Sequence, residues 1–176
     1  MLFNSSIEEQ MNNVIFIGMP TSGKSTIGIV VAKRLGFQFI DTDLLIQEQE
    51  GRLLSEIIRE EGNDGFLAIE NQVNRDVEAT HAVIAPGGSV IYCEEAMEHF
   101  KKIGVVVYLK ISYETLMKRI KDPRKRGVVL AEGQTMQMLY EERIKLFEQY
   151  ADIVIDEDDY EREEMTDRVI EAFDGL

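Results

Sequence analysis

The sequence predicts a three-layer α/β fold, in which helices cover both faces of a central parallel sheet of five strands. Five short apolar runs lack polar alternation, which is typical of strands buried on both faces. Segments with helical spacing of apolar residues separate these runs, as in βαβ units. The chain has 176 residues, of which 44% are hydrophobic, so it can bury a core of its own. We expect an N-terminal extension over residues 1–12 and a single domain over residues 13–176.

Each element follows from the local pattern. The first strand is expected at Val14–Ile17, an apolar run that ends at a glycine. A helix is expected over Ser25–Leu35, where apolar residues recur at helical spacing. The acidic tail from Tyr150 onward is expected to form a strand, an acidic loop and a solvated helix. The other expected elements are a strand at Phe37–Ile40, helices at Leu53–Glu61 and Phe66–Ala79 joined at Gly62–Gly65, and strands at Ala82–Ala85, Val105–Leu109 and Ile153–Ile155.

The composition indicates which classes of partner are excluded and which cellular compartment is expected. The 33 acidic and 19 basic residues give a formal net charge of −14. Phosphate backbones bind basic surfaces, so this charge argues against nucleic acid as the main partner. The single cysteine, Cys93, excludes an internal disulfide and fits a reducing compartment. Because no apolar run approaches 18 residues, we expect a cytoplasmic protein without a membrane span.

The segment from Gly18 to Thr26, GMPTSGKST, matches the phosphate-loop pattern G-x-x-x-x-G-K-[ST]. Its glycines let the backbone curl so that consecutive N–H groups point at phosphate oxygens. Lys24 is expected to reach the β- and γ-phosphates and Ser25 to bind Mg²⁺, and the following helix adds its N-terminal dipole. A chance match in a turn is the alternative, but the preceding strand and following helix argue against it. The expected nucleotide-binding residues are Gly18, Thr21, Ser22, Gly23, Lys24, Ser25 and Thr26.

Two further groups follow predicted strands. Asp41 and Asp43 come at the end of the second strand, and ligands of parallel sheets bind at that edge. One carboxylate can orient Mg²⁺ through water while the other accepts a hydrogen bond from a substrate hydroxyl. The alternative is an aspartate that caps the next helix. Gly87 and Gly88 follow the third strand and allow close approach of a ligand to the backbone, although a plain tight turn is a fair alternative.

Positive charge concentrates in Lys118–Arg126 of this acidic chain. Phosphoryl transfer needs cations over the developing charge, whereas a solvated basic face is the usual alternative. Arg143 follows two glutamates on a predicted helix. It can be a surface ion-pair partner or an anchor for an anion, and spacing alone does not choose between them.

The motifs, taken in order, resemble those of the shikimate kinases, small P-loop kinases of the nucleoside-monophosphate-kinase type. The resemblance runs from about Asn13 to Asp159. It implies a P-loop kinase fold with substrate-binding helices over about 41–75 and a small mobile lid over about 119–133. It also implies Mg²⁺-dependent transfer of the γ-phosphoryl group of ATP to shikimate, giving shikimate 3-phosphate for aromatic amino-acid biosynthesis. The motifs are GMPTSGKST, FIDTD, EGNDGFLAIE, APGGSV, VVVYL, RIKDPRKR, EERIKLFEQYADIVI and DEDD.

The resemblance also implies a role for each candidate residue. Asp41 would assist Mg²⁺ together with Ser25, and Asp43 would hold the ring hydroxyls and act as the base. Lys24 and the lid arginine would stabilise the transferring phosphate. The remaining implied roles are Arg126 as that lid arginine, Arg119 beside the adenine, the 156–159 loop near the adenine, Gly87 and Gly88 along the substrate, and Arg143 on the substrate carboxylate.

Three positions depart from the family pattern. The arginine that would pair with Arg143 on the substrate carboxylate is Leu67 here. A charge-assisted hydrogen bond contributes about 1.5–3 kcal/mol to binding. We therefore expect the absence of this arginine to weaken shikimate binding by about one to two orders of magnitude or more. Pro86 replaces the first of three glycines, and Gly127-Val128 replaces the lid's Pro-Leu.

These departures leave alternatives to shikimate open. Leu67 motivates a kinase for a different hydroxy acid or polyol. A regulator that binds ATP without turnover is a second alternative, and a nucleoside-monophosphate kinase would need several arginines around its acceptor. We expect a monomer whose lid closes freely, with Glu70 interacting with Arg75 on the same helix. Four retained residues argue against the regulator, because only chemistry requires all of them: Lys24, Ser25, Asp43 and Arg126.

Overall fold

The computed structural model describes residues 12–121, 128 and 130–175. The predicted N-terminal extension lies outside these residues except for its last position. Residues 122–127 and 129 of the predicted lid also lie outside them, and the candidate lid arginine, Arg126, is one of these.

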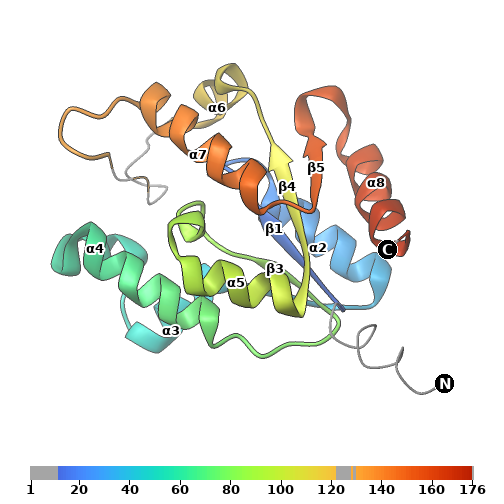
Figure 1. The fold of residues 1–176 in the computed structure, drawn as a ribbon, viewed down its shortest axis with the longest axis horizontal. Coiled ribbons are helices and arrows are strands. Elements are labelled where there is room, and N and C mark those ends of the chain that lie inside the picture. The colour runs from blue at the N-terminus through green and yellow to red at the C-terminus, as the bar shows by residue number, and fades with distance from the viewer. Residues whose placement is uncertain (1–11, 122–127, 129, 176) are drawn as a thin grey trace.

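The centre of the molecule is one parallel sheet of five strands in the order β2-β3-β1-β4-β5. All four neighbouring pairs run parallel, so helical crossovers connect consecutive strands (Figure 1). The predicted fold class is therefore confirmed. The strands are β1 (Asn13–Ile17), β2 (Gln38–Asp41), β3 (Ala82–Ala85), β4 (Gly104–Lys110) and β5 (Ile153–Asp156).

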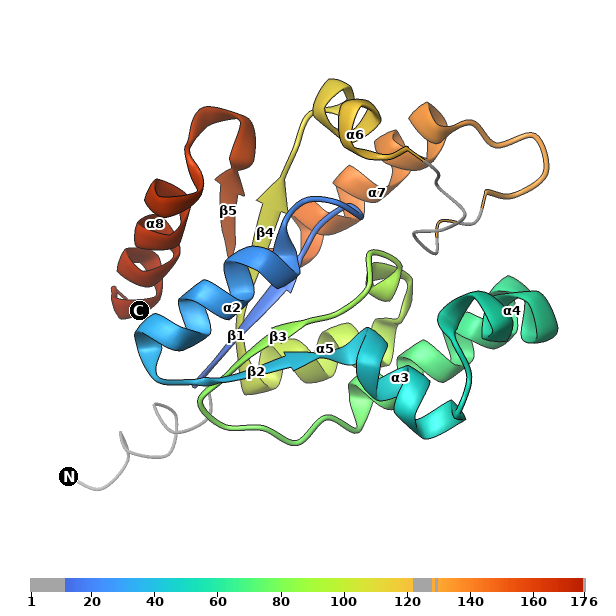
Figure 2. The ribbon, with the colours of Figure 1, turned by 180° about the vertical axis from the view of Figure 1, so that it is seen from behind.

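Helices form a layer on each side of this sheet (Figures 1 and 2). On one face α2 (Lys24–Leu35) packs beside α8 (Arg162–Asp174), and on the other α5 (Glu94–Ile103) and α7 (Met136–Tyr150) contact β4. The helices α3 and α4 pack together and reach the second layer through α5. The remaining elements are α3 (Thr42–Glu50), α4 (Leu54–Arg75), α6 (Tyr113–Arg119) and the 3₁₀ turns η1 (Val90–Tyr92) and η3 (Glu157–Asp159).

The central strands have apolar side chains on both faces because a helix layer covers each face. Along β1, Ile15 and Ile17 join the core beneath α5 and α7, whereas Val14 and Phe16 join the core beneath α2 and α8. The predicted burial of all five strands holds only for β1, β3 and β4. At the sheet edges β2 and β5 are partly exposed, since each has a neighbouring strand on one side only.

The predicted pair of helices after β2 is one long element, α4, with a kink. Gly62 adopts φ 70° and ψ −175°, which interrupts the helix at the first of the predicted joining residues. The second half ends at Arg75 and not at Ala79 as predicted. Val77 is 6% exposed and packs into the core, so the backbone leaves the helix before this residue.

Asn13, the first residue of β1, holds the amino-terminal edge of the sheet together. Its side-chain amide donates to the carbonyls of Ala79 and Ile103, both at 2.8 Å, and accepts from the N–H of Ala82 at 2.9 Å. The side chain is 1% exposed, so all these polar groups are satisfied away from water. This asparagine therefore connects β1 to the starts of β3 and β4.

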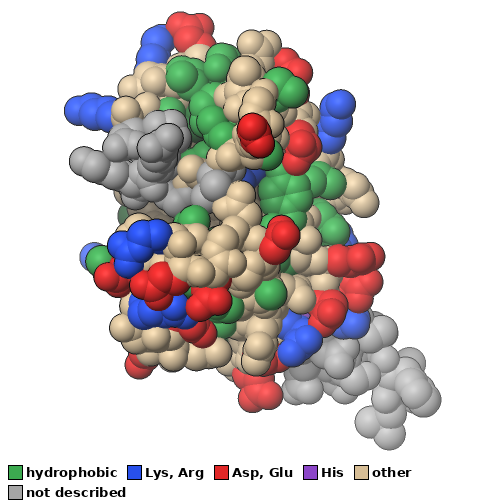
Figure 3. Space-filling model, turned by 90° about the vertical axis from the view of Figure 1, so that its left-hand side faces the viewer, with side chains coloured by type: hydrophobic (Ala, Val, Ile, Leu, Met, Phe, Trp, Pro, Cys, Tyr) green, Lys and Arg blue, Asp and Glu red, His purple; other side chains and the backbone are tan. Residues whose placement is uncertain are grey.

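The described surface mixes both signs of charge. On the face viewed in Figure 3, acidic and basic side chains lie side by side with hydrophobic side chains between them. Among the described residues, no helix is both long and apolar enough to cross a membrane.

Candidate active site

The phosphate loop joins β1 to α2 and has a backbone that few side chains tolerate. Gly18, Thr21 and Gly23 adopt positive φ values of 153°, 68° and 83°. A Cβ on Gly18 would lie 2.6 Å from the carbonyl oxygen of Leu109, so this position requires glycine. Thr21 is the strained exception, and strain of this kind persists where the surrounding structure fixes a functional loop.

The start of α2 is available for an anion. The helix begins directly after Gly23, whose lack of a side chain leaves the first N–H groups without a side-chain cap. These N–H groups and the helix dipole favour phosphate oxygens at this point. Thr21, Gly23, Ser25 and Thr26 line a cavity of about 680 Å³ at the same place.

Lys24 lies within the loop, where it is 9% exposed. Its Nζ atom donates to the carbonyl oxygens of Gly18 at 2.8 Å and Met19 at 2.9 Å. Burial lowers the pKa of Lys24 to about 8, although the nearby Asp43 carboxylate opposes this shift. The ammonium group therefore lies beside the cavity and can exchange these carbonyls for phosphate oxygens.

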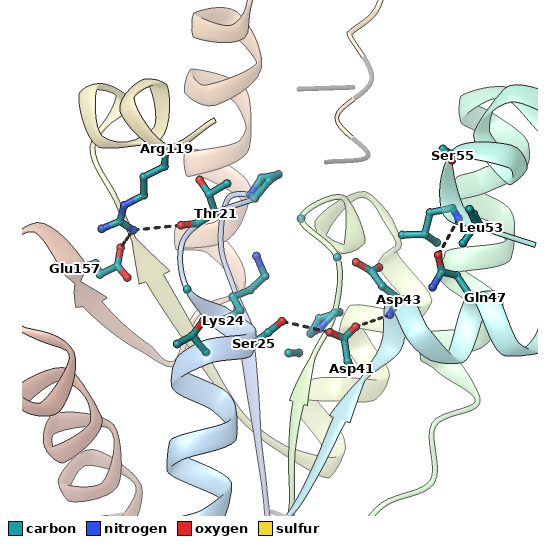
Figure 4. Close-up of a pocket in the computed structure, with 18 of the residues that line it drawn as sticks. Thr21, Lys24, Ser25, Asp41, Asp43, Gln47, Leu53, Ser55, Arg119 and Glu157 are labelled. Carbon is teal, nitrogen blue, oxygen red and sulfur yellow. Dashed lines mark hydrogen bonds and ion pairs between the residues drawn. The ribbon is translucent and has the colours of Figure 1, made fainter. Parts of the chain in front are cut away.

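Ser25 and Asp41 form the predicted metal pair. The Ser25 hydroxyl donates to the Asp41 carboxylate at 3.3 Å, beside Lys24 in Figure 4. Asp41 also caps α3 by accepting the N–H of Asp43 at 3.0 Å, so the capping alternative is confirmed for this residue, and its role toward Mg²⁺ stays a prediction. A hydroxyl and a carboxylate next to a phosphate cradle fit the oxygen ligands that Mg²⁺ prefers.

Asp43 and Glu70 place two carboxylates around one glycine. A Cβ on Gly87 would lie 2.8 Å from Oε1 of Glu70 and 2.9 Å from Oδ1 of Asp43, so a side chain here would collide with both. Burial, reinforced by Asp41, raises the pKa of Asp43 to about 6. Asp43 and Gly87 line the main cavity together with the phosphate loop, whereas Glu70 lies behind them and does not line it.

Glu70 itself is fully buried, and the predicted interaction with Arg75 is wrong. One carboxylate oxygen accepts the Ser89 hydroxyl at 2.6 Å, and the other has no partner among the described residues. Arg75 instead pairs with Glu95 at 2.7 Å on the protein surface. Burial raises the pKa of Glu70 to about 7, although the hydrogen bond from Ser89 and the charges of Arg143 and Lys24 oppose this shift.

Arg143 is an internal side chain, so the surface ion-pair alternative is wrong. It is 5% exposed, and its guanidinium carbon lies 5.4 Å from the centre of the Tyr92 ring. Its Nη1 atom lies 3.3 Å from the position of a Cβ on Gly88, which lines the main cavity. Its Nε atom is buried with no partner among the described residues. A buried cation of this kind suits an anionic group on a ligand.

A second cavity of about 300 Å³ adjoins Arg143. Leu67 lines it from α4 and packs against the core, so no cation from this helix position accompanies Arg143. Any anion that binds here depends on Arg143 and on neighbouring polar groups, which include Ser89 and Tyr92.

Arg119 lies at the opposite end of the main cavity, at the end of α6. Its Nη1 atom donates to the Thr21 carbonyl at 3.2 Å and pairs with Glu157 (Figure 4). Glu157 belongs to the 156–159 loop that the resemblance places near the adenine, whereas the sequence missed Arg162, because only the fold brings α8 to the phosphate loop. The structure brings these predicted site residues to the main cavity: Thr21, Gly23, Lys24, Ser25, Thr26, Asp41, Asp43, Gly87, Gly88 and Arg119.

Four predicted site residues do not line the main cavity among the described residues. Gly18 and Ser22 support the loop from behind the cavity lining, and Arg143 lines the adjoining cavity. Arg126 lies outside the described residues. Taken together, a phosphate loop, a hydroxyl–carboxylate pair and a facing acceptor pocket define a P-loop kinase of small molecules.

Comparisons with known proteins identify the family. The family model described as shikimate kinase matches residues 20–174. The shikimate kinase of Thermodesulfovibrio yellowstonii is 32% identical over 94% of this chain and 97% of its own length. A shikimate kinase of Clostridium botulinum is 36% identical over 82% and 87%. The chain belongs to the shikimate kinase family.

Solved structures agree with this assignment. The shikimate kinase of Acinetobacter baumannii, solved in complex with shikimate, has a TM-score of 0.84 to this chain at 26% identity and covers 93% of both chains. The shikimate kinase of Aquifex aeolicus has a TM-score of 0.77 at 28% identity, covering 93% of this chain and 96% of its own.

Proposed function

We propose that this protein transfers the γ-phosphoryl group of ATP, bound with Mg²⁺, to a hydroxyl of shikimate. The observation that carries the proposal is one cavity in which Lys24 and the start of α2 face Asp43 and Gly87. Membership of the shikimate kinase family and the shikimate bound in the Acinetobacter relative support this acceptor. We further propose that residues 13–176 act as one domain of a cytoplasmic monomer.

The nucleotide side of the reaction follows from the loop. Backbone N–H groups of Gly23 to Thr26 and the Lys24 ammonium would bind the phosphate oxygens. Ser25 and Asp41 would hold Mg²⁺, which neutralises charge on the β- and γ-phosphates when bound. Arg126 would add a second cation over the transferring group, as the family resemblance implies.

The acceptor side depends on Asp43. Its pKa of about 6 leaves it ionised at neutral pH and still basic enough to accept a proton. In the transfer, the acceptor hydroxyl gives its proton to Asp43 as its oxygen bonds to the γ-phosphorus. The bond from that phosphorus to the β,γ-bridging oxygen breaks, and ADP leaves.

The anion of shikimate would bind at Arg143, which is buried with an unpartnered Nε atom. Leu67 supplies no second cation, so the affinity of the carboxylate is lower than two arginines would provide. The same observation supports a second candidate acceptor: a different hydroxy acid or a polyol that needs only one cation.

The test is ADP release from Mg²⁺–ATP with shikimate and with a panel of hydroxy acids and polyols. Saturable turnover on shikimate, lost in Lys24→Ala and Asp43→Asn, supports the proposal. Turnover on another acceptor alone assigns the chain to the second candidate. ATP binding without turnover on any acceptor contradicts kinase activity and favours a regulator.

A further inference from the structure

Glu157 is a buried carboxylate that the proposed reaction does not use. It is the first residue of η3, directly after β5, and its side chain is 6% exposed. Its Oε1 atom lies 2.8 Å from the position of a Cβ on Gly23, so the carboxylate packs against the phosphate loop. Burying a negative charge costs free energy unless an opposite charge pairs with it and donates hydrogen bonds to it.

The partner is Arg119, which connects Glu157 to the loop. The carboxylate pairs with Nη1 of Arg119, and the same nitrogen donates to the carbonyl of Thr21 at 3.2 Å. The side chain of Arg119 is 41% exposed, so without these contacts it would sample many rotamers. The ion pair therefore fixes a mobile cation at one orientation beside the strained residue of the loop.

The neighbouring residue of η3 holds the other end of the same helix. Asp158 accepts the N–H of Ser112 at 3.0 Å and the hydroxyl of Thr115 at 2.8 Å, at the start of α6. Because α6 is only seven residues long, Glu157 and Asp158 attach both of its ends to η3. The position of Arg119 is thus set by two consecutive acidic residues.

The direction of the nucleotide follows from the layout of the cavity. Asp43 lies on one side of Lys24, and Arg119 and Glu157 lie on the other (Figure 4). The γ-phosphate must face the acceptor, so the nucleoside extends towards Arg119. We infer that Glu157 is a positioning residue that holds Arg119 at the nucleoside end of the site for binding of ATP. This inference rests on the proposed function as far as ATP is the nucleotide.

Two effects of Glu157 on ATP oppose each other. Its negative charge repels phosphates, whereas its hydrogen bond prepares Arg119 for the nucleotide. Glu157→Gln removes the charge and keeps an oxygen that accepts from Arg119, while Glu157→Ala removes both. If positioning dominates, the alanine variant binds ATP more weakly and the glutamine variant retains most of the affinity.

The experiment is calorimetric titration of Mg²⁺–ATP into the protein without an acceptor. It uses Glu157→Ala, Glu157→Gln, Arg119→Ala and the double alanine variant. The matched control is Glu164→Ala, which removes a glutamate from an exposed arginine pair on α8, 3.6 Å from Arg168. We expect Glu157→Ala to raise the Kd for ATP roughly tenfold, Glu157→Gln less than about threefold, and the control not at all.

The double-mutant cycle decides whether Glu157 acts through Arg119. We expect the double variant to bind ATP like Arg119→Ala alone, because the second substitution has nothing left to position. Additive effects, tighter binding by Glu157→Ala, or equal behaviour of the alanine and glutamine variants would each overturn the inference. Circular dichroism and thermal unfolding establish that each variant is folded.

The ATP-binding titration tests this inference independently of the proposal that shikimate is the acceptor. Binding of ATP is measured without shikimate, so a failure of shikimate turnover leaves the inference standing. In variants that turn over, the KM for ATP should rise while the KM for shikimate stays within about twofold, since Asp43 lies on the far side of Lys24 from Arg119.

Discussion

Replacement of Glu70 by glutamine should stabilise the protein, and the gain should grow with pH. The carboxyl group is fully buried, accepts one hydrogen bond from Ser89, and has an oxygen without a partner among the described residues. Burial raises its pKa to about 7 from an ordinary value of 4.5. The folded state therefore binds a proton that the unfolded state releases, and stability falls as the pH rises from 4.5 to 7.

The magnitude follows from the two pKa values. Their difference corresponds to a cost of about 3 kcal/mol at pH 8.5, of which about 1 kcal/mol is already present at pH 5.5. Glu70→Gln removes this cost, because the neutral amide needs no ionisation. Its oxygen can accept the Ser89 hydroxyl, and its NH₂ group can donate to Asp43 across Gly87. The variant's advantage should thus increase by about 2 kcal/mol between the two pH values.

The assay is urea unfolding of both proteins at pH 5.5 and pH 8.5, followed by circular dichroism. Glu98→Gln is the matched control, because it removes one charge from an exposed position and so measures the general repulsion in a chain of net charge −14. The reasoning is refuted if Glu70→Gln gains the same free energy at both pH values, or no more than the control. We expect its acceptor turnover to fall as well, since Glu70 borders the same glycine as Asp43.

Three further substitutions test other parts of the structure. Leu67→Arg should lower the KM for shikimate about tenfold and leave the KM for ATP unchanged, because it adds a second cation beside Arg143. Steady-state kinetics measure both constants. An unchanged KM for shikimate would show that the missing cation does not limit binding. Gly18→Ala should reduce ATP turnover about 100-fold, since its Cβ would lie 2.6 Å from the Leu109 carbonyl oxygen, and near-normal activity would contradict the loop geometry. Asn13→Ala should lower the free energy of unfolding by about 3 kcal/mol, measured by urea unfolding, because two carbonyls and one N–H lose their partner. A loss below about 1 kcal/mol would mean that water replaces the side chain.

The sequence alone predicted the strands, the loop and the helix interruption that depend on short-range residue patterns. Five apolar runs separated by helical patterns predicted the parallel sheet, because burial on both faces leaves a direct mark on composition. The phosphate loop was predicted because its backbone requires glycine and its chemistry requires Lys24 and Ser25 at fixed spacing. The sequence predicted two helices joined at residues 62–65, and the interruption falls at Gly62, the first of these, although the helices on either side form one element.

Only the tertiary structure determined the surroundings and partners of the buried charged side chains, because these depend on contacts between segments far apart in the chain. Spacing could not choose between a surface and an internal Arg143, and packing of α7 against η1 placed it inside. Glu70 was expected to meet Arg75 along its helix, but the turn after β3 brings Ser89 to it. The resemblance placed the 156–159 loop near the adenine, but only the structure shows that Glu157 packs against Gly23, 134 residues earlier, because the parallel strands β1 and β5 end at one edge of the sheet. Sequence patterns report which residues are buried, whereas the partner of a buried charge is fixed by the fold that surrounds it.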